Sequence, residues 1–211
     1  MQKKGFTIIE IVIVFLLIFG VTFLILPQSI SNTKKAKLIS KWTSQYSNLG
    51  YVFSVIKTQQ NKEIEKVLYG NKTKEEKEKV LIEIIKPYFR MNSKVDFKKY
   101  QQFYMDGSKV KLYDKYSIKD MYLTSSNEII GLKITDEDCA PRSMCLFMLF
   151  DVNGLESPNT WGYDIYGINV IDNEIIPLGS NVSQRDLAEN CSIKGLGYYC
   201  SYYYLIGGKF E

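Results

Sequence analysis

The N-terminal segment constrains this chain more than any other, because it contains a long apolar run interrupted by one carboxylate. Residues 6–26 are apolar apart from two threonines and Glu10. At about 1.5 Å per residue, a helix over this run is about 31 Å long, which matches the roughly 30 Å hydrocarbon core of a bilayer. The sequence therefore predicts a membrane-spanning helix. An ionisable group at the centre of such a span costs about 2.5–3.5 kcal/mol, so Glu10 needs an explanation.

The residues leave two explanations for Glu10 open. It lies close to the start of the span, where its carboxylate can reach the interface at lower cost. Alternatively, a cut after Gly5 would leave an amine on Phe6, one helical turn from Glu10 and on the same face. An amine and a carboxylate attract strongly in a medium of low dielectric constant. If the two groups belong to neighbouring copies, the pair turns the helix into an assembly device.

Gly5 and Phe6 follow two lysines, and Glu10 comes four residues after Phe6. With Pro27 at the end of the apolar run, this pattern over residues 3–27 resembles the class III signal of type IV pilins and type II secretion pseudopilins. The resemblance implies that a prepilin peptidase cuts after Gly5 and methylates Phe6. It further implies that Glu10 pairs with the N-terminus of an adjacent subunit, and that Pro27 kinks the helix. The implied partners are other pilins or pseudopilins, the prepilin peptidase, and an inner-membrane assembly platform with its ATPase.

The residues that flank the apolar run set its expected orientation. Lys3 and Lys4 favour a cytoplasmic N-terminus, whereas three lysines between residues 34 and 37 compete with them. An ordinary secretory signal would end in a small-residue cleavage site, which residues 25–28 lack. The resemblance requires a leader that faces a cytoplasmic peptidase. We therefore expect a single-pass protein of the bacterial inner membrane, with its C-terminal domain outside the cytoplasm, from which it enters the filament.

The composition argues against catalysis by this chain. None of its 211 residues is a histidine, which excludes Ser-His-Asp and Cys-His catalysis and histidine-ligated metal sites. The formal charge is +4, and it becomes +2 once Lys3 and Lys4 are lost, because 25 basic side chains then face 23 acidic ones. A charge of this size does not indicate nucleic acid as a partner. We therefore expect that the protein is not an enzyme.

Two helices are predicted in the first half of the chain. An apolar stripe from Trp42 to Ile56 steps by three or four residues, which continues the first helix beyond the apolar run. Core packing is the interpretation of this stripe. A second helix is predicted over 74–86, with Thr73 opening a capping box and Pro87 ending the helix.

From about residue 109 the pattern changes to short strands. They are predicted at 121–124, 129–135, 144–150, 167–171 and 174–177. Helices that precede strands are typical of an α+β fold with an antiparallel sheet. The expected fold class is α+β and pilin-like, with a long N-terminal membrane-spanning helix packed on a C-terminal antiparallel sheet domain. The expected division is a leader over 1–5, a transmembrane and assembly helix over 6–27, the ectodomain half of that helix over 28–60, and an α+β domain over 61–211.

Four cysteines lie beyond the apolar run, at Cys139, Cys145, Cys191 and Cys200. An even number in a domain outside the cytoplasm predicts two disulfides. Three pairings are possible. The preferred one closes two local loops, Cys139 with Cys145 and Cys191 with Cys200. A zinc site made of the four cysteines is disfavoured, because such ligands usually come in closer pairs.

The segment from Asp151 to Asp164 is rich in oxygen ligands and follows a predicted strand. An EF-hand loop that begins at Asp151 would need acidic residues where Leu155 and Gly162 stand, so the segment is not an EF-hand. Asn153 followed by glycine favours a tight turn, as does Asp151. The alternative is a calcium site of another kind, made by Asp151, Asn153 and Asp164, since some pseudopilins bind calcium in a C-terminal loop. Turn formation is the preferred interpretation, and no other cofactor is expected.

Tyrosines gather near the C-terminus and occupy five of the seven positions from Tyr198 to Tyr204. Tyrosine combines a large contact area with a polar tip, which suits subunit interfaces or carbohydrate. The preferred interpretation is that these side chains pack the first helix against the sheet. The pattern leaves open whether the tract is a strand or a helix.

The expected function is structural. The chain would be a minor pilin or pseudopilin of a type IV pilus-like or type II secretion filament, cleaved by the prepilin peptidase and assembled through its N-terminal helix. The alternative is a membrane-anchored extracytoplasmic module that binds calcium, carbohydrate or DNA and does not polymerise. Glu10 separates the two hypotheses, because only the first needs its carboxylate for assembly.

Overall fold

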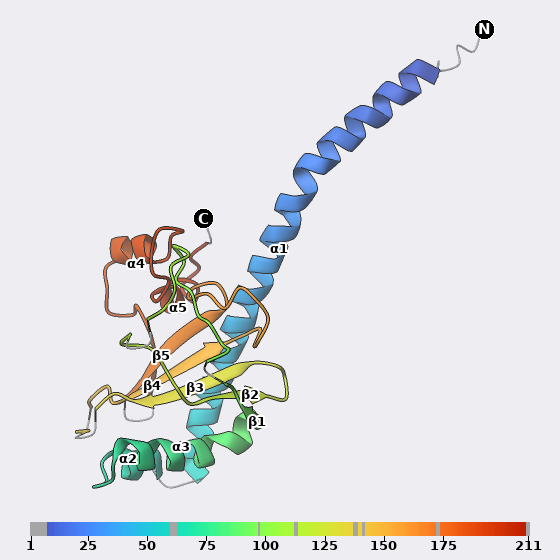
Figure 1. Cartoon of the computed structure of the whole chain (residues 1–211). Helices are drawn as coiled ribbons and strands as arrows, with labels where there is room; N and C mark the ends of the chain where they lie inside the picture. Colours follow the sequence, from blue (N-terminus) through green and yellow to red (C-terminus); the bar gives the residue numbers. More distant parts are fainter. Residues whose placement is uncertain are drawn as a thin grey trace. The chain divides into compact units, whose positions relative to one another are not determined.

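The structure, a computed structural model, describes residues 8–59, 63–96, 98–111, 114–136, 139–140, 142–171 and 174–209, without the side chains of residues 23–31, 59, 63 and 65. The chain divides into two compact units, Met1–Lys37 and Leu38–Glu211. The helix α1, Ile8–Gln59, begins in the first unit and ends in the second. Every other helix and strand of the described residues belongs to the second unit (Figure 1).

The structure contradicts the expected membrane span. Among the described residues, none of the helices is both long enough and apolar enough to cross a bilayer. The membrane-spanning helix over 6–27, and with it the pilin-like fold class that this span defines, is therefore wrong. The single-pass location in the bacterial inner membrane depended on the same span and is wrong for the same reason.

The second unit is an α+β domain built on one six-stranded sheet. Its strands are β1 (Met91–Lys94), β2 (Met121–Thr124), β3 (Ile129–Ile134), β4 (Leu146–Asp151), β5 (Ile165–Ile171) and β6 (Glu174–Pro177). The strands lie in chain order, and each pairs antiparallel with the next. This arrangement arises because each connection returns the chain beside the strand it has just left.

The strand β4 lies at the centre of the sheet and is buried along its whole length. Its side chains alternate between the two faces, as in any strand. Leu146, Met148 and Phe150 belong to the core on one face. Phe147 and Leu149 belong to the core on the other. Burial on both faces explains why β4 is a continuous apolar run in the sequence.

Helices cover the first face of the sheet. The second half of α1 packs there through the stripe that the sequence predicted, with Trp42, Leu49, Phe53 and Ile56 buried. The helices α2, Glu63–Leu68, and α3, Lys74–Phe89, complete this side (Figure 1). Irregular segments cover the second face instead. Buried residues from residues 95–118 and from the C-terminal part pack on it, namely Val95, Tyr100, Tyr104, Ile118, Leu178 and Tyr198.

The helix α3 begins as predicted but ends later. Thr73 and Glu76 form both hydrogen bonds of the capping box. Pro87 was expected to end the helix, yet it lies inside it, and the helix continues to Phe89. Proline removes one backbone donor without preventing the last turn from closing. The helix ends at Arg90, which has a left-handed backbone (φ 48°) and donates its N–H to the carbonyls of Lys86 and Pro87.

The C-terminal part adds two short helices, α4 (Gln184–Asn190) and α5 (Cys200–Tyr203). Ser183 caps α4 by accepting a hydrogen bond from the backbone of Asp186. The tyrosine tract is therefore helical in part, which its sequence left open. Tyr198 and Tyr204 are buried on opposite faces of the sheet.

The indole of Trp42 joins α1 to both the sheet and α5. It is fully buried and stacks on the ring of Tyr166 in β5, with 4.6 Å between ring centroids and an interplanar angle of 10°. Its Nε1–H donates to the carbonyl of Ser201 at 2.9 Å. The Ser201 hydroxyl in turn accepts a hydrogen bond from the backbone N–H of Gly167 at 2.9 Å. Three elements far apart in the sequence therefore share one buried contact.

We expect Trp42→Phe to lower the free energy of unfolding by about 2–3 kcal/mol, because it leaves the Ser201 carbonyl buried without its donor and opens a small cavity. Urea unfolding followed by circular dichroism measures this. Tyr51→Phe on the same helix is the control, since Tyr51 is 69% exposed and surface changes stay within about 0.5 kcal/mol. Equal effects of the two substitutions would contradict the role given to Trp42.

Candidate functional site

The first unit presents an apolar surface on α1. Twelve large apolar side chains between Ile8 and Val21 are 46–82% exposed. Only Glu10, Gly20 and Thr22 interrupt the apolar residues over 8–22. Because these side chains point in every direction around the helix axis, the helix has no polar face. A helix that is apolar all round is normally buried on all sides.

The residues of the predicted processing signal are described only in part. Gly5 and Phe6 lie outside the described residues. Glu10 lies in the first turn of α1, where a carboxylate interacts favourably with the helix dipole. Pro27 lies within the helical span of α1, and its side chain is outside the described ones. The apolar helix and Glu10 therefore form one candidate site, an assembly surface.

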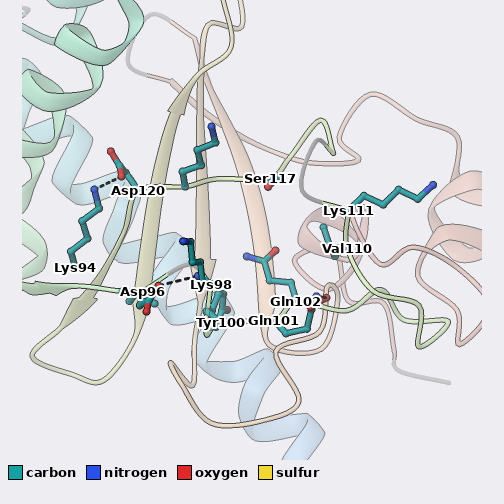
Figure 2. A pocket seen from close by; sticks show the side chains of 12 residues that line it. Lys94, Asp96, Lys98, Tyr100, Gln101, Gln102, Val110, Lys111, Ser117 and Asp120 are labelled. Atoms are coloured by element: carbon teal, nitrogen blue, oxygen red, sulfur yellow. Dashed lines mark hydrogen bonds and ion pairs between the residues drawn. The ribbon is translucent and has the colours of Figure 1, made fainter.

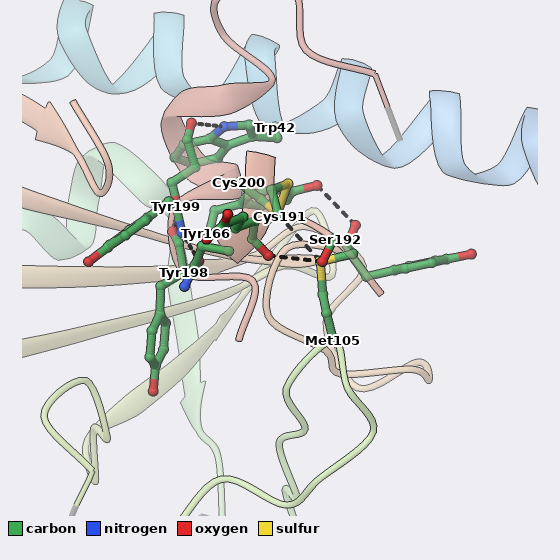
Figure 3. The surroundings of a disulfide bond; sticks show 12 residues. Trp42, Met105, Tyr166, Cys191, Ser192, Tyr198, Tyr199 and Cys200 are labelled. Atoms are coloured by element: carbon green, nitrogen blue, oxygen red, sulfur yellow. Dashed lines mark hydrogen bonds between the residues drawn. A yellow bond between two sulfur atoms is a disulfide. The ribbon is translucent and has the colours of Figure 1, made fainter. Parts of the chain in front are cut away.

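Both expected disulfides are present, in the pairing of local loops. Cys139 is bonded to Cys145, and Cys191 is bonded to Cys200. The second disulfide lies beside the C-terminal helix, and the Met105 sulfur approaches Cys200 Sγ to 3.5 Å (Figure 3). Disulfides form and persist in oxidising environments. The second unit therefore has the covalent structure of a domain that folds in such an environment.

The segment between β4 and β5 is organised by two buried carboxylates. Asp151 at the end of β4 and Asp164 before β5 are both 0% exposed. Asp151 Oδ1 accepts hydrogen bonds from the backbone N–H groups of Asn153 (3.1 Å) and Gly154 (2.9 Å). Its Oδ2 accepts one from the hydroxyl of Tyr100. Asp151 thus fixes the first turn of the segment, as the turn interpretation predicted, and ties it to the segment that covers the second face.

Asp164 closes the other end of the same segment. Its Oδ2 accepts from the N–H of Asn159 at 2.9 Å, and its Oδ1 from the N–H of Thr160 at 2.5 Å. Asn159 has a positive φ of 49°, which asparagine tolerates better than most residues. The carbonyl of Asp164 also accepts the N–H of Val152 at 2.9 Å. The two carboxylates therefore hold the two ends of one loop together.

Gly154 shows how closely this loop approaches its neighbour. Its φ is +73°, and a Cβ at this position would lie 2.1 Å from the carbonyl oxygen of Asn127 in the β2–β3 turn. Only glycine fits both the conformation and the space. The Asn153-Gly154 pair therefore serves loop packing.

Burial shifts the pKa values of the Asp151 and Asp164 carboxyl groups. Burial raises the pKa of the Asp164 carboxyl to about 7, although the N–H groups of Thr160 and Asn159 act in the opposite direction. Burial, and next the charge of Asp164, raise the pKa of Asp151 well above its ordinary value. Two buried carboxylates with no ion pair among the described residues favour the protonated form, because a second negative charge is costly in a low-dielectric interior.

The hydrogen bonds of the two carboxylates agree with the turn interpretation preferred from the sequence. Asp151, Asn153 and Asp164 do come together, but all four carboxylate oxygens of the pair already accept hydrogen bonds. These hydrogen bonds account for the position of both carboxylates by loop closure alone. Within the described residues, no group of three or more acidic, cysteine or histidine side chains is placed to hold a metal. We therefore assign Asp151 and Asp164 to loop closure.

A second polar cluster was not predicted. Asp114 accepts hydrogen bonds from the hydroxyls of Tyr104 (2.7 Å) and Tyr198 (2.5 Å). These hydrogen bonds lower the pKa of Asp114 although burial opposes them. The rings of Tyr116 and Trp161 pack around Tyr198, with centroids 4.7 Å away in both cases. The cluster joins the tyrosine tract to residues 104–116, and no sequence signal connects segments so far apart.

The raised pKa values predict that stability falls as pH rises. In the native state both carboxyls keep protons that the unfolded chain has lost above about pH 4. The stabilisation is therefore complete below about pH 4, and is lost as pH rises towards 7 and beyond. Asp151→Asn keeps an oxygen for the Asn153 and Gly154 donors and a donor towards Tyr100, without a charge. We expect this variant to be at least as stable as the natural chain at pH 8 and to lose less stability between pH 4 and pH 8, by about 1 kcal/mol or more.

Urea unfolding at a series of pH values measures the difference. Glu83→Gln is the matched control, because Glu83 is an exposed carboxyl on α3, and its pH profile should follow that of the natural chain. A uniform loss of stability in Asp151→Asn at every pH would show that its hydrogen bonds, rather than its charge, dominate.

Comparison with known proteins identifies no relative of this chain. No protein-family model matches it, and neither the curated proteins nor the solved structures give a match. The pilin resemblance of residues 3–27 therefore stays a prediction from the sequence.

Proposed function

We propose that this protein is a structural subunit of a filament of the type IV pilin or pseudopilin kind, assembled through α1 and matured by cleavage after Gly5. The observation that carries the proposal is the exposed apolar surface of α1 between Ile8 and Val21. Exposed apolar area on this scale marks an interaction site. In a filament, the partners that cover it are the same helices of neighbouring copies.

The distribution of the apolar side chains favours several neighbours over one. A dimer would cover one side of the helix and leave the rest exposed, since two helices meet along a single stripe. Side chains are exposed on all sides of α1 over residues 8–22. A bundle of many copies buries all of them, as the centre of a helical fibre does. Heterologous contacts that do not close into a ring produce such open assemblies.

The second unit supports a role outside the reducing cytoplasm. Its two disulfides require an oxidising environment to persist. Its sheet is buried on both faces. These features suit a rigid domain carried on the outside of a fibre. The proposed partners of the chain are fellow subunits, the prepilin peptidase, and the assembly platform with its ATPase.

N-terminal sequencing of the mature protein from its native cells tests the processing step. We expect the chain to begin at Phe6 with a methylated amine, and its mass to correspond to residues 6–211. Gly5→Leu should abolish the cut, because the peptidase of the family resembled requires glycine before the cleaved bond. A mature chain that still begins at Met1 would contradict the proposal.

Substitution of Glu10 tests assembly. If Glu10 pairs with the amine of a neighbour, Glu10→Ala should reduce the yield of filaments at least tenfold. A loss of about 1.4 kcal/mol of binding free energy per subunit contact is enough for a tenfold change. Electron microscopy and sedimentation of filaments measure the yield. Glu83→Ala is the control, since it removes an exposed carboxylate from α3. An unchanged filament yield in Glu10→Ala would contradict the pairing of Glu10 with a neighbour's amine, and an absence of filaments from the natural chain itself would favour a module that does not polymerise.

A further inference from the structure

A cleft lies on the side of the sheet that irregular segments cover. It opens between the end of β1 with the residues that follow it (94–96 and 98–102) and residues 110–111 and 117–120, which precede β2 (Figure 2). Its volume is about 840 Å³, within the range of about 300–1,000 Å³ that is usual for ligand sites. None of the residues of the assembly surface lines it. The cleft therefore needs an explanation of its own.

The charges around the cleft are mainly positive. Four lysines line it, at Lys94, Lys98, Lys111 and Lys119, together with the two carboxylates of Asp96 and Asp120. Lys94 is paired with Asp120. In the described part of the chain, the ammonium groups of the other three lysines have no ion pair or hydrogen bond. The surplus of cations gives the cleft a field that attracts carboxylates or phosphates.

A buried amide adds a fixed donor. The side chain of Gln102 lines the cleft and is 4% exposed. Its Oε1 accepts a hydrogen bond from the indole of Trp161 at 3.2 Å, which orients the amide. Its Nε2 donates to the Met121 sulfur at 3.8 Å, and a thioether is a weak acceptor. An amide group with two N–H bonds is therefore held in place with donor capacity left for a ligand oxygen.

The walls between these polar groups are largely apolar. Val95 and Val110 contribute aliphatic side chains, and the lysine stems add methylene groups while their ammonium groups stay in water. A ligand that fits must therefore carry anionic groups at the rim and apolar groups between them. We propose that the cleft binds an extended acidic peptide segment in which carboxylates alternate with aliphatic side chains.

Two other classes of ligand, phosphates and sugars, fit the cleft less well. Phosphate recognition usually relies on arginine forks or on backbone N–H groups at a helix N-terminus, and the lining contains neither. Sugar rings usually stack on aromatic faces. Among the described residues of the lining, Tyr100 is the one aromatic; it is 4% exposed, and its hydroxyl is engaged with Asp151. An extended peptide meets the same positive rim without needing these groups, because successive side chains point to opposite sides.

Fluorescence anisotropy with the full chain tests the proposal. The probe is a fluorescein-labelled octapeptide of alternating glutamate and leucine, and the comparison probe replaces glutamate by glutamine. We expect saturable binding of the acidic peptide, and at least tenfold weaker binding of the neutral one. Lys111→Glu/Lys119→Glu should weaken binding of the acidic peptide at least tenfold. Raising the salt concentration should weaken it as well, because exposed charges are screened.

The matched control is Lys66→Glu/Lys194→Glu, which changes the net charge equally at two exposed lysines away from the cleft. It should bind the acidic peptide as the natural chain does, and thermal unfolding should show that both double variants are folded. Gln102→Met, which removes the amide while keeping its size, should also weaken binding.

Three outcomes would overturn the proposal. Equal binding of the acidic and neutral peptides would show that the lysine charges do not contribute to recognition. Equal losses in both double variants would show a general charge effect. Tighter binding of an oligogalacturonate or of single-stranded oligothymidylate than of the peptide, in competition with the labelled probe, would assign the cleft to another class of ligand. None of these outcomes depends on whether the protein forms filaments.

Discussion

The burial of the sheet on both faces is the constraint on which the rest of the second unit depends. A sheet with one solvent-exposed face needs only one covering layer. Here β4 contributes to two cores, so a second layer must be supplied by segments that have no regular structure. Backbone groups in such segments need partners that helices and strands would otherwise provide. Side chains such as Asp151 and Asp164 supply some of these partners.

The two buried carboxylates show how this need is met. Asp151 and Asp164 accept backbone N–H groups at both ends of the β4–β5 loop, and Tyr100 joins the loop to the layer above it. The cluster around Asp114 does the same between that layer and the tyrosine tract. The lysine-lined cleft is a gap within the same layer. The irregular layer therefore contains both the polar groups that hold the fold and the surface that is free for a ligand.

The parts predicted from the sequence were those set by local pattern. Continuous apolar runs revealed the central strands, and the capping box of Thr73 revealed the start of α3. β1 was missed because its residues Met91–Lys94 show no apolar alternation. α4 was missed because it buries one residue, Leu187, and is defined by its cap at Ser183. Short helices of this kind carry little periodic signal.

The candidate sites divide in the same way. The apolar surface of α1 can be read from the sequence alone, although the membrane span predicted there is contradicted. The disulfide pairing followed from short spacing. The hydrogen bond between Tyr100 and Asp151 joins residues 51 positions apart, and the cleft combines two segments that a hairpin-like return of the chain brings together. Such contacts depend on tertiary packing and have no signature within a single segment.

The contact of Trp42 with Tyr166 and Ser201 has a mechanical consequence. A force applied between α1 and the sheet must pass through the place where the second half of that helix packs on the sheet. Trp42 transfers such a load to β5 by ring stacking and to α5 by a hydrogen bond. β5 is paired on both sides, and the Cys191–Cys200 disulfide anchors α5 covalently at its first residue. Tension on the helix is therefore passed to a strand that is hydrogen-bonded on both sides and to a covalent link.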